Sequence, residues 1–305
     1  MRRSFSHGGH RGVARHRLCA LILLCALLAP LAPAHAADPQ PYNLVLQPTG
    51  SDQIDTAIKT SSLLATLRDS SPVPPFGLVQ RARQDIPRIT TAAESFGYYL
   101  AKTTVMIAGR ELDDPELPMV LDRTPQGRAV DANVRVELGP LYHFREVIIA
   151  GAVPTEVMSA LKLARGDPAI ASNVPAAQAR LLTALQEAGY PLAQVQEPIA
   201  RADDAAHVLD VTFPTTAGPR ADIGAITFQG LKTVNEDFAR RVLTVKSGDP
   251  FRPSRLEASR QALLNTGVFG GISVRPADRL SPDGSIAIEF DVQERPLHAV
   301  KLEGA

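Results

Sequence analysis

Two stretches of the chain repeat one order of apolar and polar positions. Residues 144–151 and 223–230 are β-rich runs that each end in glycine, and these glycines lie 79 positions apart. Gly166 and Gly248, each within a Gly-Asp-Pro triplet, lie 82 apart. Two further landmarks recur at 78 and 77 positions: Gly189 with Gly267, each with an aromatic residue one or two positions later, and 208–213 with 285–290. A period of about 80 residues exceeds that of solenoids and predicts repeated small domains.

Each repeat is predicted to run strand, helix, helix, strand, strand. The glycine after the first strand supplies a positive-φ turn, and Thr233 with Glu236 has the spacing of a capping box. The Gly-Asp-Pro triplets are predicted to end the first helix. Apolar residues three and four apart over 174–188 predict the second helix.

The last two strands of each repeat are expected as a hairpin. In the middle repeat they are 192–196 and 207–213, joined by a polar turn at 202–204. The predicted fold class is α+β, because two helices on one face of a three-stranded sheet are the minimum that buries an apolar face in about 75 residues.

A more diverged copy lies upstream. Strands are expected at 42–46, 105–107 and 133–137, with helices over 54–67 and up to Gly97. Pro87 predicts that the second helix is kinked or starts late, and 113–127 reads as a long, Pro-rich connection. The predicted domains are residues 37–139, 140–217 and 218–296.

The first 36 residues are typical of an export signal. They carry five arginines and no acidic residue, then 11 apolar residues from Leu18 to Leu28, then Ala34-His35-Ala36. Eleven residues are too few to span a bilayer as a helix, so cleavage after Ala36 is expected. The exported chain then has no cysteine, and its 27 basic against 32 acidic residues disfavour nucleic-acid binding.

No catalytic, metal-binding or cofactor-binding constellation is found in the exported part. Its three histidines, His143, His207 and His298, are scattered and lack metal-ligand spacing. The acidic pairs at 113–114 and 203–204 are read as loop charges. The sequence therefore favours a binding module over an enzyme, without cofactor.

The repeat resembles the POTRA (polypeptide-transport-associated) domains of the outer-membrane assembly superfamily. The matching residues are Gly151, Gly189 and Tyr190 in one repeat and Gly230, Gly248, Asp249, Pro250, Gly267 and Phe269 in the next. Three repeats and the step at 96–99 place the resemblance closest to the TamA subfamily. The resemblance implies a periplasmic location at the outer membrane and a membrane barrel after the repeats. Residues 297–305 alternate like the opening of a first barrel strand, so the chain is expected to be truncated there.

The resemblance also implies a function and partners. It implies binding of unfolded outer-membrane clients, such as autotransporters, by strand addition, and contact of residues 42–137 with an inner-membrane-anchored TamB-like protein. The second strand of each repeat would be the exposed edge, with candidate residues Leu192, Ala193, Gln194, Val195, Gln196, Ile272, Ser273, Val274 and Arg275. The glycines read as structural are Gly97, Gly151, Gly166, Gly189, Gly230, Gly248 and Gly267.

Two other functions remain open at this point. One is the periplasmic arm of a two-partner secretion pore, from the same superfamily. The other is a periplasmic enzyme or solute-binding protein, which a deep pocket with convergent polar groups would favour.

Overall fold

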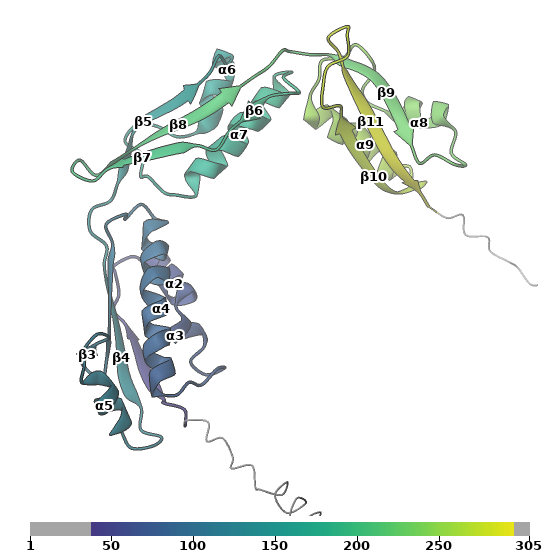
Figure 1. Ribbon diagram of the computed structural model, residues 1–305. Helices are drawn as coiled ribbons and strands as arrows, with labels where there is room; N and C mark the ends of the chain where they lie inside the picture. Colours follow the sequence, from purple (N-terminus) through teal and green to yellow (C-terminus); the bar gives the residue numbers. More distant parts are fainter. Residues whose placement is uncertain (1–37, 296–305) are drawn as a thin grey trace, which may run out of the picture.

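The computed structural model describes residues 38–295, which form three sheet-and-helix units that follow one another along an arc (Figure 1). The predicted signal peptide (1–36) and the predicted opening of a barrel strand (297–305) lie outside the described residues. Within 38–295, no helix combines the length and apolar content needed to cross a lipid bilayer.

The first unit has a four-stranded sheet in the order β1-β4-β2-β3, in which only β1 and β4 pair in parallel. Its strands are β1 (Tyr42–Leu46), β2 (Lys102–Ile107), β3 (Arg110–Glu111) and β4 (Val130–Glu137). Its helices are α2 (Asp52–Ser61), α3 (Leu63–Thr66), α4 (Pro75–Glu94) and α5 (Leu117–Asp122). Helices α2 to α4 lie on one side of the sheet (Figure 1).

In the second unit, β8 is central: it pairs in parallel with β5 on one side and antiparallel with β6 and β7 on the other. The strands are β5 (His143–Ala150), β6 (Gln194–Val195), β7 (Ile199–Asp203) and β8 (Val208–Thr216). The helical elements are α6 (Thr155–Met158), the 3-10 turn η1 (Ser159–Leu161) and α7 (Asn173–Glu187).

The third unit repeats this order in its simplest form. Its sheet order is β10-β11-β9, with β11 parallel to β9 and antiparallel to β10. The elements are β9 (Ile223–Gln229), α8 (Glu236–Val242), α9 (Pro253–Asn265), β10 (Phe269–Pro276) and β11 (Ile286–Glu294). The predicted α+β class with three sheet-and-helix units is thus confirmed.

Each unit has a hydrophobic core of its own between the sheet and its helices. The alternation along the central strand explains this: on β11, Ile286, Ile288, Phe290 and Val292 are buried, and the residues between them are more exposed. Because strand side chains alternate between the two faces, the helix-covered face is apolar and the other face is wet.

Two kinds of glycine shape these units. Gly189 follows α7 at φ +98°, and the N–H groups of Gly189 and Tyr190 donate to the carbonyls of Gln186 and Leu185, which is the Schellman pattern of a helix end. Gly151, at φ +145°, ends β5 where an added Cβ would overlap the Thr215 carbonyl of β8. Gly97 and Gly267 hold positions corresponding to Gly189, and Gly230 one corresponding to Gly151.

The prediction that the Gly-Asp-Pro triplets end the first helices is wrong. The helical segment η1 stops at Leu161 and α8 stops at Val242, several residues before Gly166 and Gly248. Gly166 and Gly248, at φ +88° and +87°, instead form turns that precede the second helix.

One other local prediction was wrong: helix α8 is capped by Asn235, whose side chain accepts from the Asp237 N–H, and not by Thr233. Helix α4 starts at Pro75 and runs through Pro87, so it does not start late. The Pro-rich connection 113–127 contains helix α5.

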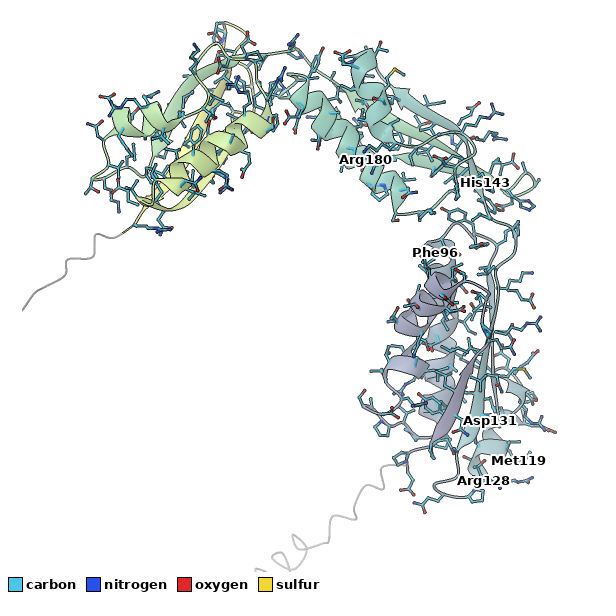
Figure 2. The ribbon with its side chains drawn as sticks, turned by 180° about the vertical axis from the view of Figure 1, so that it is seen from behind. Phe96, Met119, Arg128, Asp131, His143 and Arg180 are labelled. Carbon is cyan, nitrogen blue, oxygen red and sulfur yellow. The ribbon has the colours of Figure 1, made fainter. Side chains whose placement is uncertain are left out.

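The same main-chain bond joins consecutive units. The Tyr142 N–H donates to the Gly97 carbonyl at 2.9 Å, and the Ala221 N–H donates to the Gly189 carbonyl, also at 2.9 Å. The first junction adds an edge-to-face contact between Tyr99 and Tyr142, with ring centroids 5.2 Å apart. Figure 2 shows Phe96 and His143 at the facing ends of the first two units.

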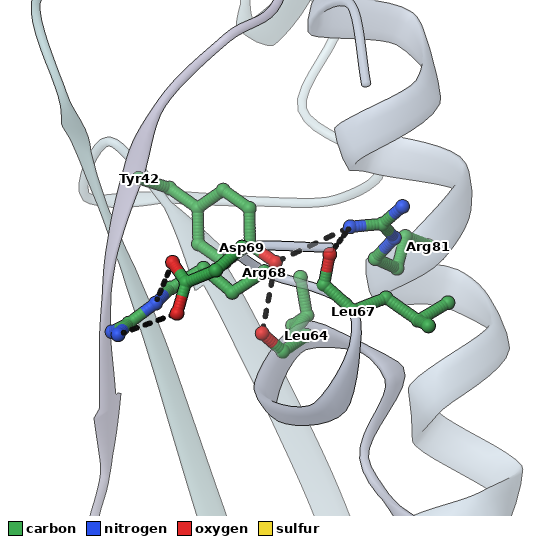
Figure 3. A network of polar contacts seen from close by, with 6 residues as sticks. All are labelled: Tyr42, Leu64, Leu67, Arg68, Asp69 and Arg81. Atoms are coloured by element: carbon green, nitrogen blue, oxygen red, sulfur yellow. Dashed lines mark hydrogen bonds and ion pairs between the residues drawn. The ribbon is translucent and has the colours of Figure 1, made fainter. Parts of the chain in front are cut away.

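A buried polar network fastens the helices of the first unit. Figure 3 shows the Tyr42 hydroxyl, which donates to the Leu64 carbonyl at 2.8 Å, and Arg81, which donates to the Leu67 carbonyl at 3.3 Å. Nearby, the fully buried Asp85 accepts from the Ser62 hydroxyl and from the N–H groups of Leu63 and Leu64, at 2.6 to 2.9 Å. Asp85 on α4 thus caps the N-terminus of α3.

We expect Asp85→Ala to destabilise the first unit by about 3 kcal/mol, because three donors, two of them buried, lose their acceptor. Hydrogen exchange of residues 62–94 in the whole chain separates this local effect from the other units. The matched control is Asp69→Ala: the Asp69 side chain is 85% exposed in its pair with Arg68, so its loss costs less than about 0.5 kcal/mol. Equal effects of the two substitutions would contradict the capping role of Asp85.

The end of β11 is fastened to the loop before α8. The Glu294 carboxylate accepts from the Lys232 N–H at 2.7 Å, from the Thr233 hydroxyl and from the Val234 N–H at 2.9 Å. Hydrogen bonds to the ionised form lower the pKa of Glu294, first the bond from Lys232, from 4.5 to about 2.

A lowered pKa makes this anchor acid-sensitive. The ionised carboxylate stabilises the fold above its ordinary pKa of 4.5, and the contribution is lost as the pH falls toward about 2. The difference in thermal unfolding between the wild type and Glu294→Gln should therefore be constant above pH 4.5 and shrink below it. A carboxyl titration of Glu294 with its midpoint near 4.5, followed by NMR, would exclude the anchor.

Candidate functional site

The open edges of the three sheets are the places where another chain could pair. A sheet edge exposes unpaired N–H and C=O groups, and each unit has one edge at its first strand and one at its second. The structure closes these edges to different degrees.

In the second and third units, the Gly-Asp-Pro turn covers only the start of the first-strand edge; within residues 38–295, no strand pairs with the outer side of β5 or β9. The Phe144 N–H donates to the Asp167 carbonyl at 2.9 Å, and the Gly166 N–H donates to the Phe144 carbonyl at 2.8 Å. Ile223 makes the equivalent bonds with Asp249 and Gly248 at 2.7 and 2.8 Å. The triplet is therefore an edge-covering turn, which explains why Gly-Asp recurs.

In the first unit, the insertion 108–124 covers part of the second-strand edge. Strand β3 pairs with the end of β2, joining Arg110 to Ile107 and Glu111 to Met106. Arg110 holds the insertion in place through ion pairs with Asp114 at 2.7 Å and with Glu116 at 2.8 Å.

In the second unit, the same edge is interrupted and partly capped. Strand β6 has only two residues, and 196–198 separates it from β7. The Gln178 side chain on α7 donates to the carbonyls of Val195 and Gln196, each at 3.0 Å. Those two carbonyls therefore already have partners.

The predicted second strand of this unit, Leu192 to Gln196, is a strand only in part. Leu192 and Ala193 lie outside any strand; Ala193 is buried and Leu192 packs against the core of the third unit. Gln194 and Val195 form β6, and most of the pairing with β8 comes from β7, whose end at residues 202–203 was read as a turn.

In the third unit, the predicted segment Ile272 to Arg275 lies in the middle of the eight-residue strand β10. Strand β10 pairs with β11 on one side, and within residues 38–295 no strand pairs with its other side. This is the longest second-strand edge of the three units.

The register shows which groups of β10 face outward. The Ala277 N–H donates to the Ala287 carbonyl, so the alternate residues Ser273 and Arg275 bond to β11 in the same phase. Ile272 and Val274 therefore direct their N–H and C=O groups away from β11, toward the open edge.

The side chains of β10 are occupied within the unit, so its backbone groups are what another chain would recognise. Ile272 and Val274 are half-buried and pack against the core. On the wet face, Arg275 pairs with Glu289 at 3.1 Å and Asp291 at 3.2 Å. An added strand would thus meet hydrogen-bonding groups that place little demand on its sequence.

Within residues 38–295, no group of three or more His, Cys, Asp or Glu side chains is arranged to hold a metal ion. His143 and His207 lie near the first junction, where His207 contacts the Tyr142 ring edge-on with centroids 5.8 Å apart. Burial and the Asp204 carboxylate raise the pKa of Tyr142 to about 12, so this tyrosine stays neutral. His298 lies outside the described residues.

Comparison with known proteins agrees with the architecture. Residues 221–295 match the POTRA family, described as "Surface antigen variable number repeat". A comparison with the sequences of characterised proteins finds no match.

Several solved structures are similar to the chain. POTRA domains 3–5 of BamA from Haemophilus influenzae share 20% identity, with 87% of this chain and 100% of that one covered and a TM-score of 0.49. POTRA domains 1–3 of Omp85 from Anabaena share 14%, with 85% and 96% covered and a TM-score of 0.33. CdiB from Escherichia coli shares 13%, with 74% and 36% covered and a TM-score of 0.27. The residues that match the POTRA family are those of the third unit, and the chain contains three POTRA-like units.

Proposed function

We propose that the three units form the periplasmic arm of an outer-membrane assembly or secretion factor of the Omp85 type. In this proposal the arm binds extended segments of unfolded client proteins by strand addition at β10. The observation that carries it is the open eight-residue edge of β10, whose counterparts in the other two units are partly covered or broken.

Strand addition suits a client that has not yet folded. An extended chain aligned with β10 would meet the outward N–H and C=O groups of Ile272 and Val274. Because every residue except proline carries both groups, binding would tolerate many client sequences. The small sheets in series, each with its own core, favour this role over that of an enzyme or solute-binding protein.

The finer assignment is to a TamA-like factor. It is supported by the three units and by the helix-ending step at 96–99, as set out from the sequence. In this assignment the clients include autotransporters, the first unit contacts a TamB-like protein anchored in the inner membrane, and the arm is held at the outer membrane. Deleting the gene should then reduce autotransporter display at the cell surface. Loss of one secreted passenger with normal display would favour the two-partner secretion arm instead.

We expect Val274→Pro to reduce client binding at least about fivefold. Proline removes the outward N–H of this position and leaves the bonds from β10 to β11 intact. Binding is measured by crosslinking from a photoreactive residue at the exposed position 273 to a urea-denatured outer-membrane β-barrel protein diluted into buffer.

Two matched variants serve as controls. Val274→Thr keeps the N–H and a β-branched side chain and should bind like the wild type. Val195→Pro removes an N–H from the interrupted edge of the second unit and should leave crosslinking at 273 unchanged. Undiminished crosslinking in a folded Val274→Pro variant would rule out strand addition at β10.

A further inference from the structure

A groove of about 500 Å³ lies between α4 and α5 of the first unit. Its apolar lining comes from both helices and the loop before α5, with Phe76 and Val79 on one side and Leu112, Leu117 and Leu121 on the other. Leu112, Leu117 and Leu121 are buried parts of the core, so one side of the groove is formed by core residues of the unit.

The high exposure of the Phe76 side chain has no role in the packing of the first unit. Phe76 is 73% exposed, the most of any large hydrophobic residue described, and it stands at the start of α4 beside the groove. An exposed aromatic ring next to an apolar depression is typical of an interaction site.

The groove exists because of the insertion between the second and last strands. In the third unit those strands, β10 and β11, are joined by the loop 277–285, which contains no helix, and in the second unit β7 and β8 are joined by 204–207. In the first unit the connection 108–129 includes α5, which extends the helical layer beside α4. Helix α5 therefore distinguishes the first unit from the two others.

The charges around the groove are predominantly acidic. Its lining includes Asp113, Asp114 and Asp122 against one basic residue, Arg83. Arg83 pairs with Asp113 at 2.8 Å, and Asp114 pairs with an arginine of the insertion. Asp122 is exposed, and among residues 38–295 it has no ion pair.

We infer that this groove binds a short amphipathic helix of another protein, with apolar residues on one face and a Lys or Arg beside them. A helix is chosen because the lining residues recur three or four positions apart on both helices, at 76, 79 and 83 on α4 and at 117 and 121 on α5, and helices pack against one another through side chains at this spacing. The basic residue follows from Asp122, because Asp113 and Asp114 are already paired with arginines. This inference is independent of strand addition at β10, which lies in a different unit.

The probe is a synthetic peptide of about 14 residues with leucines at helical spacing and two lysines flanking them. It is titrated into the whole chain, and the methyl NMR signals of Val79, Leu117 and Leu121 report binding. A twin peptide with glutamates in place of the lysines should bind at least about fivefold more weakly.

Two exposed apolar residues provide matched variants. Phe76→Ser should weaken binding of the lysine peptide about tenfold without unfolding the unit, since the ring contributes little to the core. Met119→Ser, on α5 but outside the groove lining, should leave binding unchanged; Met119 is 44% exposed and is labelled in Figure 2.

Three results would overturn the inference. Equal binding of the lysine and glutamate peptides would show that the acidic charge beside the groove does not select a basic partner. Undiminished binding in Phe76→Ser would place the peptide elsewhere. Concentration-dependent dimerisation of the wild type that is lost in Phe76→Ser would show that a second copy of the chain, and not another protein, covers the groove.

Discussion

The unpaired edge of a small β-sheet is the constraint on which the rest of this structure depends. A sheet of three or four strands needs helices on only one face to bury its core, but its outer strands still expose main-chain donors and acceptors. In the second and third units, the turn around Gly166 or Gly248 covers the start of one edge. The other is treated differently in each unit: by an inserted strand and helix, by Gln178, or not at all along β10. The differences between otherwise similar units thus lie where intermolecular pairing would occur.

Much of the fold could be predicted from the sequence because the repeat is carried by backbone requirements. Gly151 and Gly189 have positive φ, and a position that only glycine occupies easily leaves a mark at a fixed offset in the next unit. Buried alternation, as on β11, is equally visible. These signals are local, so they give the order of elements without any knowledge of their partners.

What could not be predicted depends on contacts between distant residues. Strand β7 is exposed along most of its length, and since it buries few side chains it lacks the apolar alternation that reveals a strand. To predict that the β6 edge is covered, one would need to know that the Gln178 side chain on α7 reaches the Val195 carbonyl. For the groove, Leu117 and Leu121 looked like part of a Pro-rich loop, because the short helix α5 is stabilised by the core it packs on and not by its own propensity.

The bond between consecutive units has a consequence for how such chains grow. At one junction the donor belongs to a tyrosine and at the other to an alanine, yet the acceptor is in each case the carbonyl of the glycine that ends the preceding helix. Since neither atom belongs to a side chain, a duplicated unit carries both halves of the joint with it. Gene duplication could therefore lengthen the array in one step, because each new unit brings both a donor and an acceptor for the joint.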